Sequence, residues 1–448
     1  MRHKTVLRCP RDRPVARFLR VSHAGQLLEQ ISRGESVDAE AVAGLVRDWD
    51  AGAASEAQMG AWCMAMHLGG LDAAGLKGVV RGLIAAGDRL ELSRIGPSAV
   101  VQSLGAVGDP SSLIAAPIAA ALGVRVPYLC ARGTDDVGGD YDRLEAVAGY
   151  RSRIEVSAFV RCLRDTGMAV AGEVDRLVPA RARLGVLSQS VGLATSAPIA
   201  TAASMAAAIA SGAEGIVLVL PVGPGGLASR SDVHTIAELA ADVAEEWQRA
   251  IRILSLPVDS PRGPVVGNGL EIALVGEVLT GQHDGPIRDF AVELAGAMAE
   301  LSEVALPGEG CEQAEDALRD GHALALAERW IEAQGGNPEI WTHPGDHIPE
   351  APLQEDVVAP RGGRVTAMDP RAIGAAARWV GAGRMHPSQA IDVSVGVRLL
   401  VEVGDEVRTG QVVAQIDARD RGLADSAAGM TERAIEVDHR ALAVREDA

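Results

Sequence analysis

The stretch from residue 99 to residue 122, AVVQSLGAVGDPSSLIAAPIAAAL, decides the fold of this chain. Its apolar start, 99–101, predicts a short strand, the glycines at 105 and 108 favour a tight loop, and 112–122 has the composition of a buried helix. A strand that passes through a loop into a helix is the repeating unit of an α/β domain. Further apolar stretches alternate with helical patterns and predict three more strands, at 124–130, 216–220 and 251–256. We therefore expect a mixed or parallel sheet covered by helices.

The chain before this unit predicts a helical domain. From about residue 24 to residue 92 the apolar residues recur at helical spacing, and Asp38 and Ser55 stand where helix N-caps are expected. Later in the chain, Ser196-Ala-Pro198 opens an alanine-rich segment that closes at Gly212. We expect this helix to rejoin the helical domain.

The last hundred residues have a different character. Residues 344–360 are acidic and rich in proline, which is typical of a linker. Beyond them, 363–368 and 397–417 are β-rich, and the turn 403–410, VGDEVRTG, favours a small barrel-like subdomain. We divide the chain into an N-terminal extension (1–22), a helical domain (23–92 with 180–212), an α/β domain (96–179 and 213–345) and a C-terminal β-rich subdomain (346–448).

The composition restricts the partners. A net charge of −18 over 448 residues disfavours nucleic acid and anionic membranes. No stretch approaches about 18 uninterrupted apolar residues, and the basic first twenty residues lack the apolar segment of a secretory signal. The five cysteines are scattered, which indicates neither disulfides nor zinc and fits a reducing cytoplasm. We expect a cytoplasmic protein with a small-molecule ligand and without a metal or cofactor.

A set of short motifs occurs in a fixed order from about residue 24 to about residue 420: Gly105-Ala-Val-Gly-Asp109, Ala131-Arg-Gly133, Asp142-Arg-Leu-Glu145, Ser196-Ala-Pro198, Gly267-Asn268 and Ile391-Asp-Val-Ser-Val-Gly396. In this order they resemble the pyrimidine-nucleoside phosphorylases, the thymidine phosphorylase family. The resemblance implies a helical and an α/β domain with a deep cleft between them, and a homodimer formed through the helical domain. It also implies a phosphate site on the α/β side, a pyrimidine site on the helical side, and transfer of a pentose from base to phosphate.

The phosphate half of this site departs from the family pattern. The family loop, which looks like K-H-S-T-G-G-V-G-D, falls on residues 101–109, so Val101 replaces the lysine and Gln102 the histidine. The only lysines are Lys4 and Lys77, so no shift in register supplies another. Of the groups that would cradle phosphate, Ser103, Gly105 and Ser112 remain, and Cys130 replaces a hydroxyl. Gln102 stays a candidate catalytic residue, and the others are candidate ligand-binding residues.

Two acids add to this departure. The family's second phosphate motif, H-T-G-G-T, falls on residues 136–140 and places Asp136 and Asp140 beside the site. A carboxylate ~4 Å from a phosphate charge costs about 4 kcal/mol at an effective dielectric of ~20, roughly a thousandfold in affinity. We therefore predict weak phosphate binding.

The base half is altered in the same direction. The family's R-D before the inter-domain helix falls on Ser188-Gln189, and its S-x-x-x-K on that helix falls on Ala203 and Ala207. Ser188 and Ser190 are the remaining candidate ligand-binding side chains there. Arg181 and Arg183 lie near in sequence and offer a replacement charge.

Several interpretations stay open. Asp140 is either a nucleophile or general base that uses water in place of phosphate, or a structural residue that caps a turn or pairs with Arg143. Gly105 and Gly108 either form an anion-binding nest or permit a tight turn. By the resemblance, Glu271 matches a carboxylate of a monovalent-cation site; otherwise it is a solvated acid at a helix start.

Three functions follow from these alternatives. The first is an altered pentosyltransferase that acts on or binds a nucleoside-like or sugar ligand. The second is a non-catalytic dimeric relative that senses a ligand or binds a partner. The third is ordinary phosphorolysis, which the substitutions disfavour.

Overall fold

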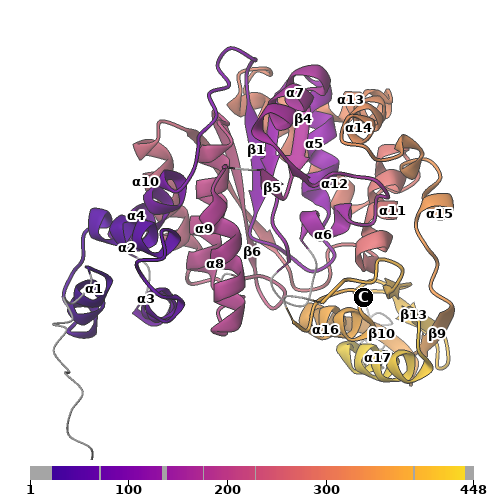
Figure 1. Cartoon of the computed structure of the whole chain (residues 1–448). Coiled ribbons are helices and arrows are strands. Elements are labelled where there is room, and N and C mark those ends of the chain that lie inside the picture. Colours follow the sequence, from indigo (N-terminus) through magenta and orange to yellow (C-terminus); the bar gives the residue numbers. More distant parts are fainter. Residues whose placement is uncertain are drawn as a thin grey trace, which may run out of the picture.

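The computed structural model describes residues 23–69, 72–133, 139–174, 176–227, 229–386 and 389–438. In Figure 1 the first helices lie to the left, the α/β layers occupy the centre, and the last hundred residues form a separate body at the lower right. This arrangement agrees with the helical domain, α/β domain and small β-rich subdomain that the sequence predicts.

The helical part is built from α1 (His23–Ser32), α2 (Ala39–Asp50), α3 (Glu56–Gly69), α4 (Ala73–Ala85), α8 (Pro179–Ser190) and α9 (Ala197–Ala210). Both predicted N-caps are confirmed, because Asp38 accepts a hydrogen bond from the Ala41 amide at 2.7 Å and Ser55 accepts one from the Gln58 amide at 3.2 Å. Helices α8 and α9 contact α3 and α4, so the later segment does rejoin the earlier one.

Close packing between α2 and α4 depends on glycine. A Cβ atom added at Gly78 would lie 2.5 Å from the Cβ atom of Val42, well inside van der Waals contact. The missing side chain therefore lets the two helices approach closely, in a chain whose core is made chiefly of Ala, Val, Leu and Ile.

The α/β part has parallel strands. β1 (Ala99–Ser103), β6 (Gly215–Val222) and β7 (Ala250–Pro257) form a three-stranded sheet in the order β1-β6-β7, and the predictions for all three strands are confirmed. β2 (Val126–Leu129) pairs with β4 (Met168–Ala171), and β3 (Arg153–Ile154) pairs with β5 (Glu173–Val174), both in parallel. The helices of this part are α5 (Ser111–Ala121), α6 (Asp140–Leu144), α7 (Val156–Thr166), α10 (Val233–Glu246), α11 (Asn268–Leu279), α12 (Pro286–Leu301), α13 (Gly310–Arg319), α14 (His322–Ala333), η1 (Pro338–Ile340) and α15 (Pro344–His347).

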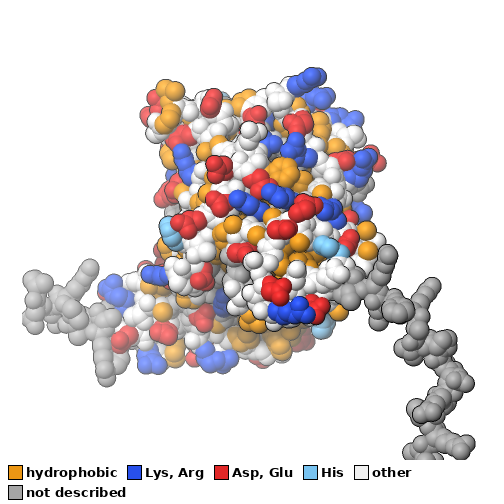
Figure 2. All heavy atoms as spheres, turned by 90° about the vertical axis from the view of Figure 1, so that its left-hand side faces the viewer, with side chains coloured by type: hydrophobic (Ala, Val, Ile, Leu, Met, Phe, Trp, Pro, Cys, Tyr) orange, Lys and Arg blue, Asp and Glu red, His pale blue; other side chains and the backbone are white. Residues whose placement is uncertain are grey.

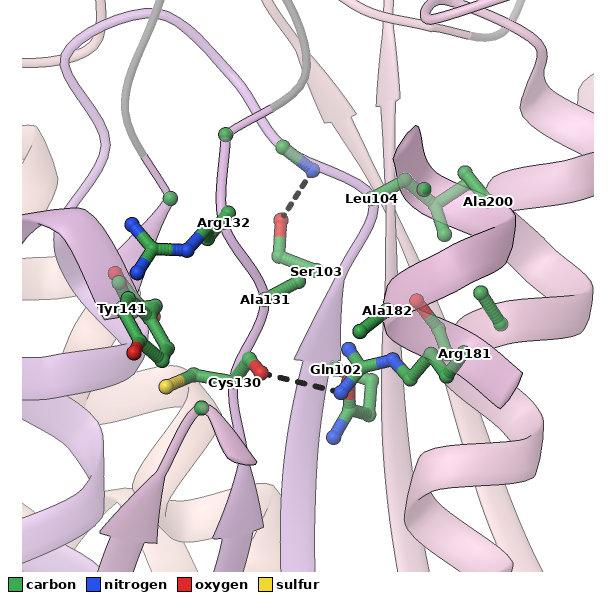
Figure 3. Close-up of a pocket in the computed structure, with 18 of the residues that line it drawn as sticks. Gln102, Ser103, Leu104, Cys130, Ala131, Arg132, Tyr141, Arg181, Ala182 and Ala200 are labelled. Carbon is green, nitrogen blue, oxygen red and sulfur yellow. Dashed lines mark hydrogen bonds between the residues drawn. The ribbon is translucent and has the colours of Figure 1, made fainter. Parts of the chain in front are cut away.

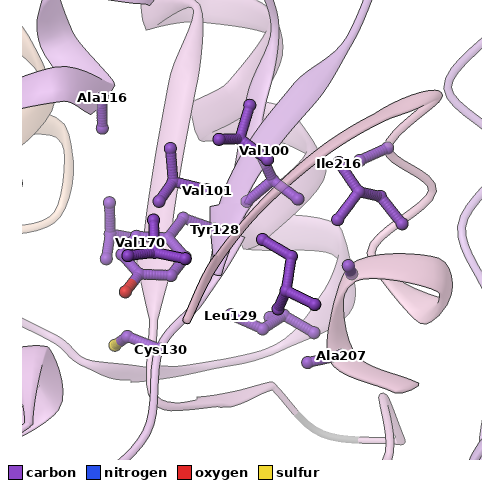
Figure 4. Packing of buried hydrophobic residues seen from close by; sticks show 14 of the residues in the cluster. Val100, Val101, Ala116, Tyr128, Leu129, Cys130, Val170, Ala207 and Ile216 are labelled. Atoms are coloured by element: carbon purple, nitrogen blue, oxygen red, sulfur yellow. The ribbon is translucent and has the colours of Figure 1, made fainter. Parts of the chain in front are cut away.

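Helices on both sides of β1 bury it. Strand β1 contacts α9 of the helical part as well as α5 and α12 of the α/β part. Figure 4 shows the result, with Ala116 of α5, Val100 of β1, Ile216 of β6 and Ala207 of α9 in one apolar cluster. Because α9 packs on the central strands, the helical wall is held close to the carboxyl ends of β1 and β2.

The C-terminal part contains two antiparallel sheets around a core of its own. One joins β8 (Val265–Val266), β11 (Gly396–Leu399), β13 (Val412–Ala418) and β9 (Leu353–Val358); the other joins β12 (Glu406–Val407), β10 (Gly363–Met368) and β14 (Ile435–Asp438). Helices α16 (Pro370–Val380) and α17 (Arg421–Ala434) pack on each other. The barrel-like subdomain thus takes the form of two small sheets instead of a closed barrel.

The prediction of a linker at 344–360 is wrong in part. Residues 353–358 form the edge strand β9, which pairs with β13 from Leu353↔Ala418 to Val358↔Val412. The strand carries Glu355 and Asp356 but buries Val357, and Gln415 of β13 donates to Asp356 at 2.9 Å. An edge strand tolerates acidic residues because one of its sides is open to solvent. For this reason the composition of 344–360 resembles that of a linker.

None of the helices in the described ranges is long and apolar enough to cross a lipid bilayer. On the face shown in Figure 2, acidic and basic side chains are interspersed instead of gathered by sign. This pattern differs from the basic stripe of a nucleic-acid-binding surface.

Candidate active site

A cavity of about 600 Å³ lies between the two larger parts of the molecule. The carboxyl ends of β1 and β2, with the first residues of α5 and α6, form one wall, and α8 and α9 form the other. Figure 3 shows Gln102, Ser103 and Cys130 facing Arg181, Ala182 and Ala200 across it. The cleft expected from the sequence is therefore present, and most of the candidate site residues line it.

Val101, which the resemblance matches to the family's phosphate lysine, belongs to the core. Val101 is only 2% exposed and packs in the central apolar cluster (Figure 4). Gln102 lines the cavity, but it is 2% exposed and its Nε2 atom donates to the Leu129 carbonyl at 3.4 Å. This pair of residues offers a ligand no positive charge.

The glycine loop that follows is a tight turn. The Ser103 hydroxyl accepts a hydrogen bond from the Gly105 amide at 3.2 Å, and Gly105 and Gly108 have φ values of 101° and 67°. A Cβ atom on Gly108 would lie 3.0 Å from the Val265 carbonyl oxygen. The Asp109 carboxylate accepts a hydrogen bond from the amide of Ser111, the first residue of α5, at 3.1 Å. These contacts give both glycines a conformational role and engage one of the amides that an anion would need.

Asp140 belongs to a buried network. Its two carboxylate oxygens accept from the Tyr128 hydroxyl and from the Arg143 guanidinium, each at 2.6 Å, and Arg143 also bonds Glu271. Asp140 and Arg143 are 6% and 4% exposed. The contacts match the structural alternative for Asp140, while its catalytic role stays a prediction.

The electrostatics of this network favour charge pairing. Burial by itself disfavours the charged guanidinium, but Glu271 and Asp140 outweigh it and raise the pKa of Arg143 above its usual value. Burial, together with the neighbouring Asp140, raises the pKa of Tyr128 well above its usual value, so the phenol stays protonated and donates. Glu271 is 1% exposed, so the expectation of a solvated acid is wrong: it is held inside by Arg143 and by the Gly267 amide at 3.0 Å.

Ser112 and Cys130 both line the cavity and are buried. Burial raises the pKa of the Cys130 thiol far above its usual range, which keeps it protonated and weakly reactive. Asp136 lies outside the described residues. The chain on either side of it is tied to Asp142, which accepts from the amides of Gly133 at 2.6 Å and Gly139 at 2.9 Å.

The predicted ligand-binding serines of the helical wall make hydrogen bonds within their own helix. Ser188 lines the cavity, yet its hydroxyl donates to the Gly185 carbonyl of its own helix at 2.9 Å. Ser190 does not line the cavity, because two residues turn a helix by about 200°, and its hydroxyl donates to Leu187 at 2.8 Å. Ser190 therefore lies outside this cavity, and its role in ligand binding stays a prediction. Ala203 lines the cavity, and Ala207 is packed in the core.

Two side chains of α8 bridge the walls. The Nη1 atom of Arg181 donates to the carbonyl oxygens of Leu129 and Cys130, both at 3.1 Å, and Gln189 donates to Gly133 at 3.2 Å. Arg181 lies two helical turns before Ser188, so both project from the same face of α8. The sequence offered Arg181 only as a neighbour of the altered position; an arginine seven residues away on the same helix face was the available signal.

Arg183 points elsewhere. Its guanidinium lies 4.2 Å from the centre of the Trp49 ring and donates to Glu56 at 2.7 Å on the helical part. Of the two replacement arginines, only Arg181 reaches the cavity.

Other arginines of the cavity wall are already engaged. Arg132, Arg143, Arg176 and Arg384 form ion pairs with the carboxylates of Asp142, Asp140, Asp88 and Asp142, respectively. Arg371 of α16 donates to the carbonyl oxygens of Pro224 and Gly226 at 2.5 and 3.1 Å. Within the described ranges, no group of three or more His, Cys, Asp or Glu side chains is placed to hold a metal ion.

Comparison with known proteins defines the class. Residues 25–87 match the glycosyl transferase family helical bundle domain, residues 100–218 its a/b domain, and residues 364–438 the pyrimidine nucleoside phosphorylase C-terminal domain. The fold is also similar to anthranilate phosphoribosyltransferase from Thermus thermophilus, with a TM-score of 0.56 and 20% identity over 68% of this chain and 98% of that one. The scaffold is that of a pentosyltransferase.

Two curated relatives identify the family more closely. A thymidine phosphorylase of Mesorhizobium japonicum is 31% identical over 88% of this chain and 91% of its own length. A pyrimidine-nucleoside phosphorylase of Geobacillus stearothermophilus is 29% identical over 87% and 90% of the two chains. The chain belongs to the thymidine and pyrimidine-nucleoside phosphorylase family, as its motifs predict.

Proposed function

We propose that this protein binds a nucleoside-like or sugar ligand in the inter-domain cavity and that ordinary phosphorolysis is lost or altered. The observation that carries the proposal is the fate of three positively charged positions of the family motifs. They are occupied by Val101, Ser188 and Ala207, of which the first and last are packed in the core. Without these charges, neither a phosphate nucleophile nor a departing base anion is stabilised.

Three polar groups of the cavity, Ser103, Ser188 and Asp140, support the same conclusion. The hydroxyls of Ser103 and Ser188 are engaged in local hydrogen bonds, and both oxygens of Asp140 have partners. A nucleophile or base would first have to be released from these contacts. The binding of a ligand in a largely apolar cavity needs no such release.

A direct assay tests the proposal. Purified protein is incubated with thymidine or uridine and inorganic phosphate, and release of thymine or uracil is measured, with the Geobacillus stearothermophilus enzyme as positive control. We expect no release at enzyme concentrations that suffice for the control. Release at a comparable rate would overturn the proposal.

A second measurement addresses binding. Thermal shifts with nucleosides, bases, sugar phosphates and phosphate report which ligands stabilise the folded state. We expect stabilisation by a nucleoside-like or sugar compound and little by phosphate alone. Stabilisation by phosphate alone would restore the family reaction as the best explanation.

We also propose that the protein is a homodimer. The family resemblance supports this state, and so do the exposed apolar side chains Leu68 and Val186, which are 77% and 53% exposed on the contacting helices α3 and α8. Light scattering of the purified chain tests it, and a monomeric mass at micromolar concentration would contradict it.

A further inference from the structure

Arg181 occupies an unusual place in the cavity. It projects from α8 on the helical wall and reaches the end of β2 on the opposite wall. Within the described part of the chain it has no carboxylate partner, unlike Arg143 or Arg384 nearby. A guanidinium placed between two walls without a counter-charge is costly unless something else supplies one.

The free edge of this guanidinium faces the cavity. Its Nη1 atom donates hydrogen bonds to the carbonyl oxygens of Leu129 and Cys130. Among the described residues, the Nε and Nη2 atoms have no protein partner, and neither is sealed from the cavity. These two atoms form the edge of arginine that binds a carboxylate or phosphate through two parallel hydrogen bonds.

The surroundings of Arg181 favour the binding of an anionic ligand, because the described residues next to it supply no negative charge of their own. Figure 3 shows Gln102 and Ala182 next to Arg181, and Leu104 and Ala200 farther along the cavity, and none of these side chains carries a negative charge. Burial lowers the pKa of the Arg181 guanidinium from its usual value, the direction expected for a cation that lacks a counter-charge. An anion that enters this space would gain a charge-assisted contact away from bulk water.

We propose that Arg181 anchors an anionic group that the ligand itself carries, either a carboxylate or a phosphate ester. The proposal deepens the proposed function, on which it rests for the nucleoside-like body of the ligand. One guanidinium, with Val101 where the family has lysine, suits an attached anion whose remaining atoms fill the apolar cavity. Free phosphate has no such atoms and gains only the single contact.

Calorimetric titration with matched probes tests this anchor. The probes are uridine, uridine 5′-monophosphate and the 5′-carboxylic acid of uridine, which separate the neutral ligand from the two anionic sources. The proteins are the wild type, Arg181→Gln, Arg181→Lys and, as matched control, Arg183→Gln on the outer side of the same helix. Circular dichroism checks that each variant is folded.

We expect at least one anionic probe to bind the wild type about tenfold or more tightly than uridine. Arg181→Gln should lose about tenfold to a hundredfold of that affinity while the affinity for uridine changes by less than about twofold. Arg181→Lys should retain part of it, because it keeps the charge but not the two-pronged edge. Arg183→Gln should leave all affinities unchanged.

Two results would overturn the anchor. One is equal affinity of the wild type for neutral and anionic probes, including the case in which none binds. The other is a loss in Arg181→Gln that is equal for uridine and for the anionic probes. The phosphorolysis assay reports on the proposed function separately: base release would refute that function, and the affinity ratios would still decide the role of Arg181.

Discussion

The two walls of the cavity have departed from the family pattern in different ways. On the α/β wall, polar and charged groups are abundant, but Asp140, Arg143, Glu271 and Tyr128 satisfy one another. On the helical wall, the resemblance places Ser188, Ala203 and Ala207 at the family's polar positions, and Arg181 lies two turns before Ser188. The charges of the α/β wall are paired with one another, whereas the helical wall carries a partly buried cation, Arg181, that has no carboxylate partner among the described residues.

A charged residue in a cleft can therefore have one of two roles: it can stabilise the fold or bind a ligand. A charge with an internal partner contributes chiefly to the fold, because removing one member leaves the other buried and unpaired. A charge without a partner contributes little to the fold and is available to a ligand. Variants on the two walls should therefore affect different measurements.

The largest effect on stability is expected from Arg143→Met. It leaves Asp140 and Glu271 buried without their shared cation, and we expect a loss of about 3–5 kcal/mol in the free energy of unfolding measured with urea. The control is Arg47→Met, because Arg47 and its partner Glu40 are 43% and 68% exposed, and this change should cost about 1 kcal/mol or less. Equal losses in the two variants would remove the distinction between internal and exposed pairs.

Asp140→Asn should have a smaller effect on stability. The amide keeps the shape but not the charge, and we expect a loss of about 1–3 kcal/mol by urea denaturation because the bond to Arg143 is charge-assisted. Tyr128→Phe, which removes only the neutral donor, should cost about 1 kcal/mol.

The same Asp140 variant also addresses catalysis. If the protein catalyses any glycosyl transfer, we expect Asp140→Asn to abolish it. A folded variant with unchanged turnover would exclude Asp140 from the mechanism and leave it a purely structural residue.

On the helical wall, Ser188→Ala should change stability by less than about 1 kcal/mol. The Ser188 hydroxyl donates to the Gly185 carbonyl of its own helix. A helix carbonyl of this kind usually accepts a backbone hydrogen bond or contacts solvent as well, so it does not depend on the serine. Ser190→Ala is the matched control outside the cavity. A large loss of ligand affinity in Ser188→Ala alone would show that its hydroxyl turns toward the ligand.

The smallest expected effect concerns thiol reactivity. Burial raises the pKa of Cys130, so its thiolate is scarce, and alkylation by iodoacetamide should stay slow between pH 7 and pH 9. Cys311, which is exposed, serves as the accessible control and should be alkylated at least about tenfold faster. Mass spectrometry measures both rates, and rapid, pH-dependent labelling of Cys130 would contradict its burial.

Patterns local in sequence predicted the elements well. The β1–loop–α5 unit, the strands β6 and β7, and the caps Asp38 and Ser55 depend on a few neighbouring residues, so they could be read from periodicity and turn chemistry. The edge strand β9 was missed because its acids and prolines resemble a linker until a neighbouring strand supplies the hydrogen bonds.

The candidate site was only partly predictable. The match of Val101 and Ala207 to charged positions of the family stays a prediction, and the structure shows that both side chains are buried. The partner Arg143 of Asp140 was predictable because it lies three residues away, but the partner Tyr128 comes from β2 and was not. The bond from Arg143 to Glu271 of α11 was not predictable either.

The sequence by itself determined the family scaffold, because ordered motifs carry it, and it predicts that the family's charged groups are replaced, because that prediction needs only the identity of the matched residues. Only the tertiary structure decided which remaining charges are available. Arg181 and Arg183 are chemically identical and lie on one helix, but the direction of each side chain sends one across the cavity and the other onto Trp49. Whether a charged side chain is available to a ligand depends on contacts between segments that are distant in sequence, and those contacts exist only in the folded chain.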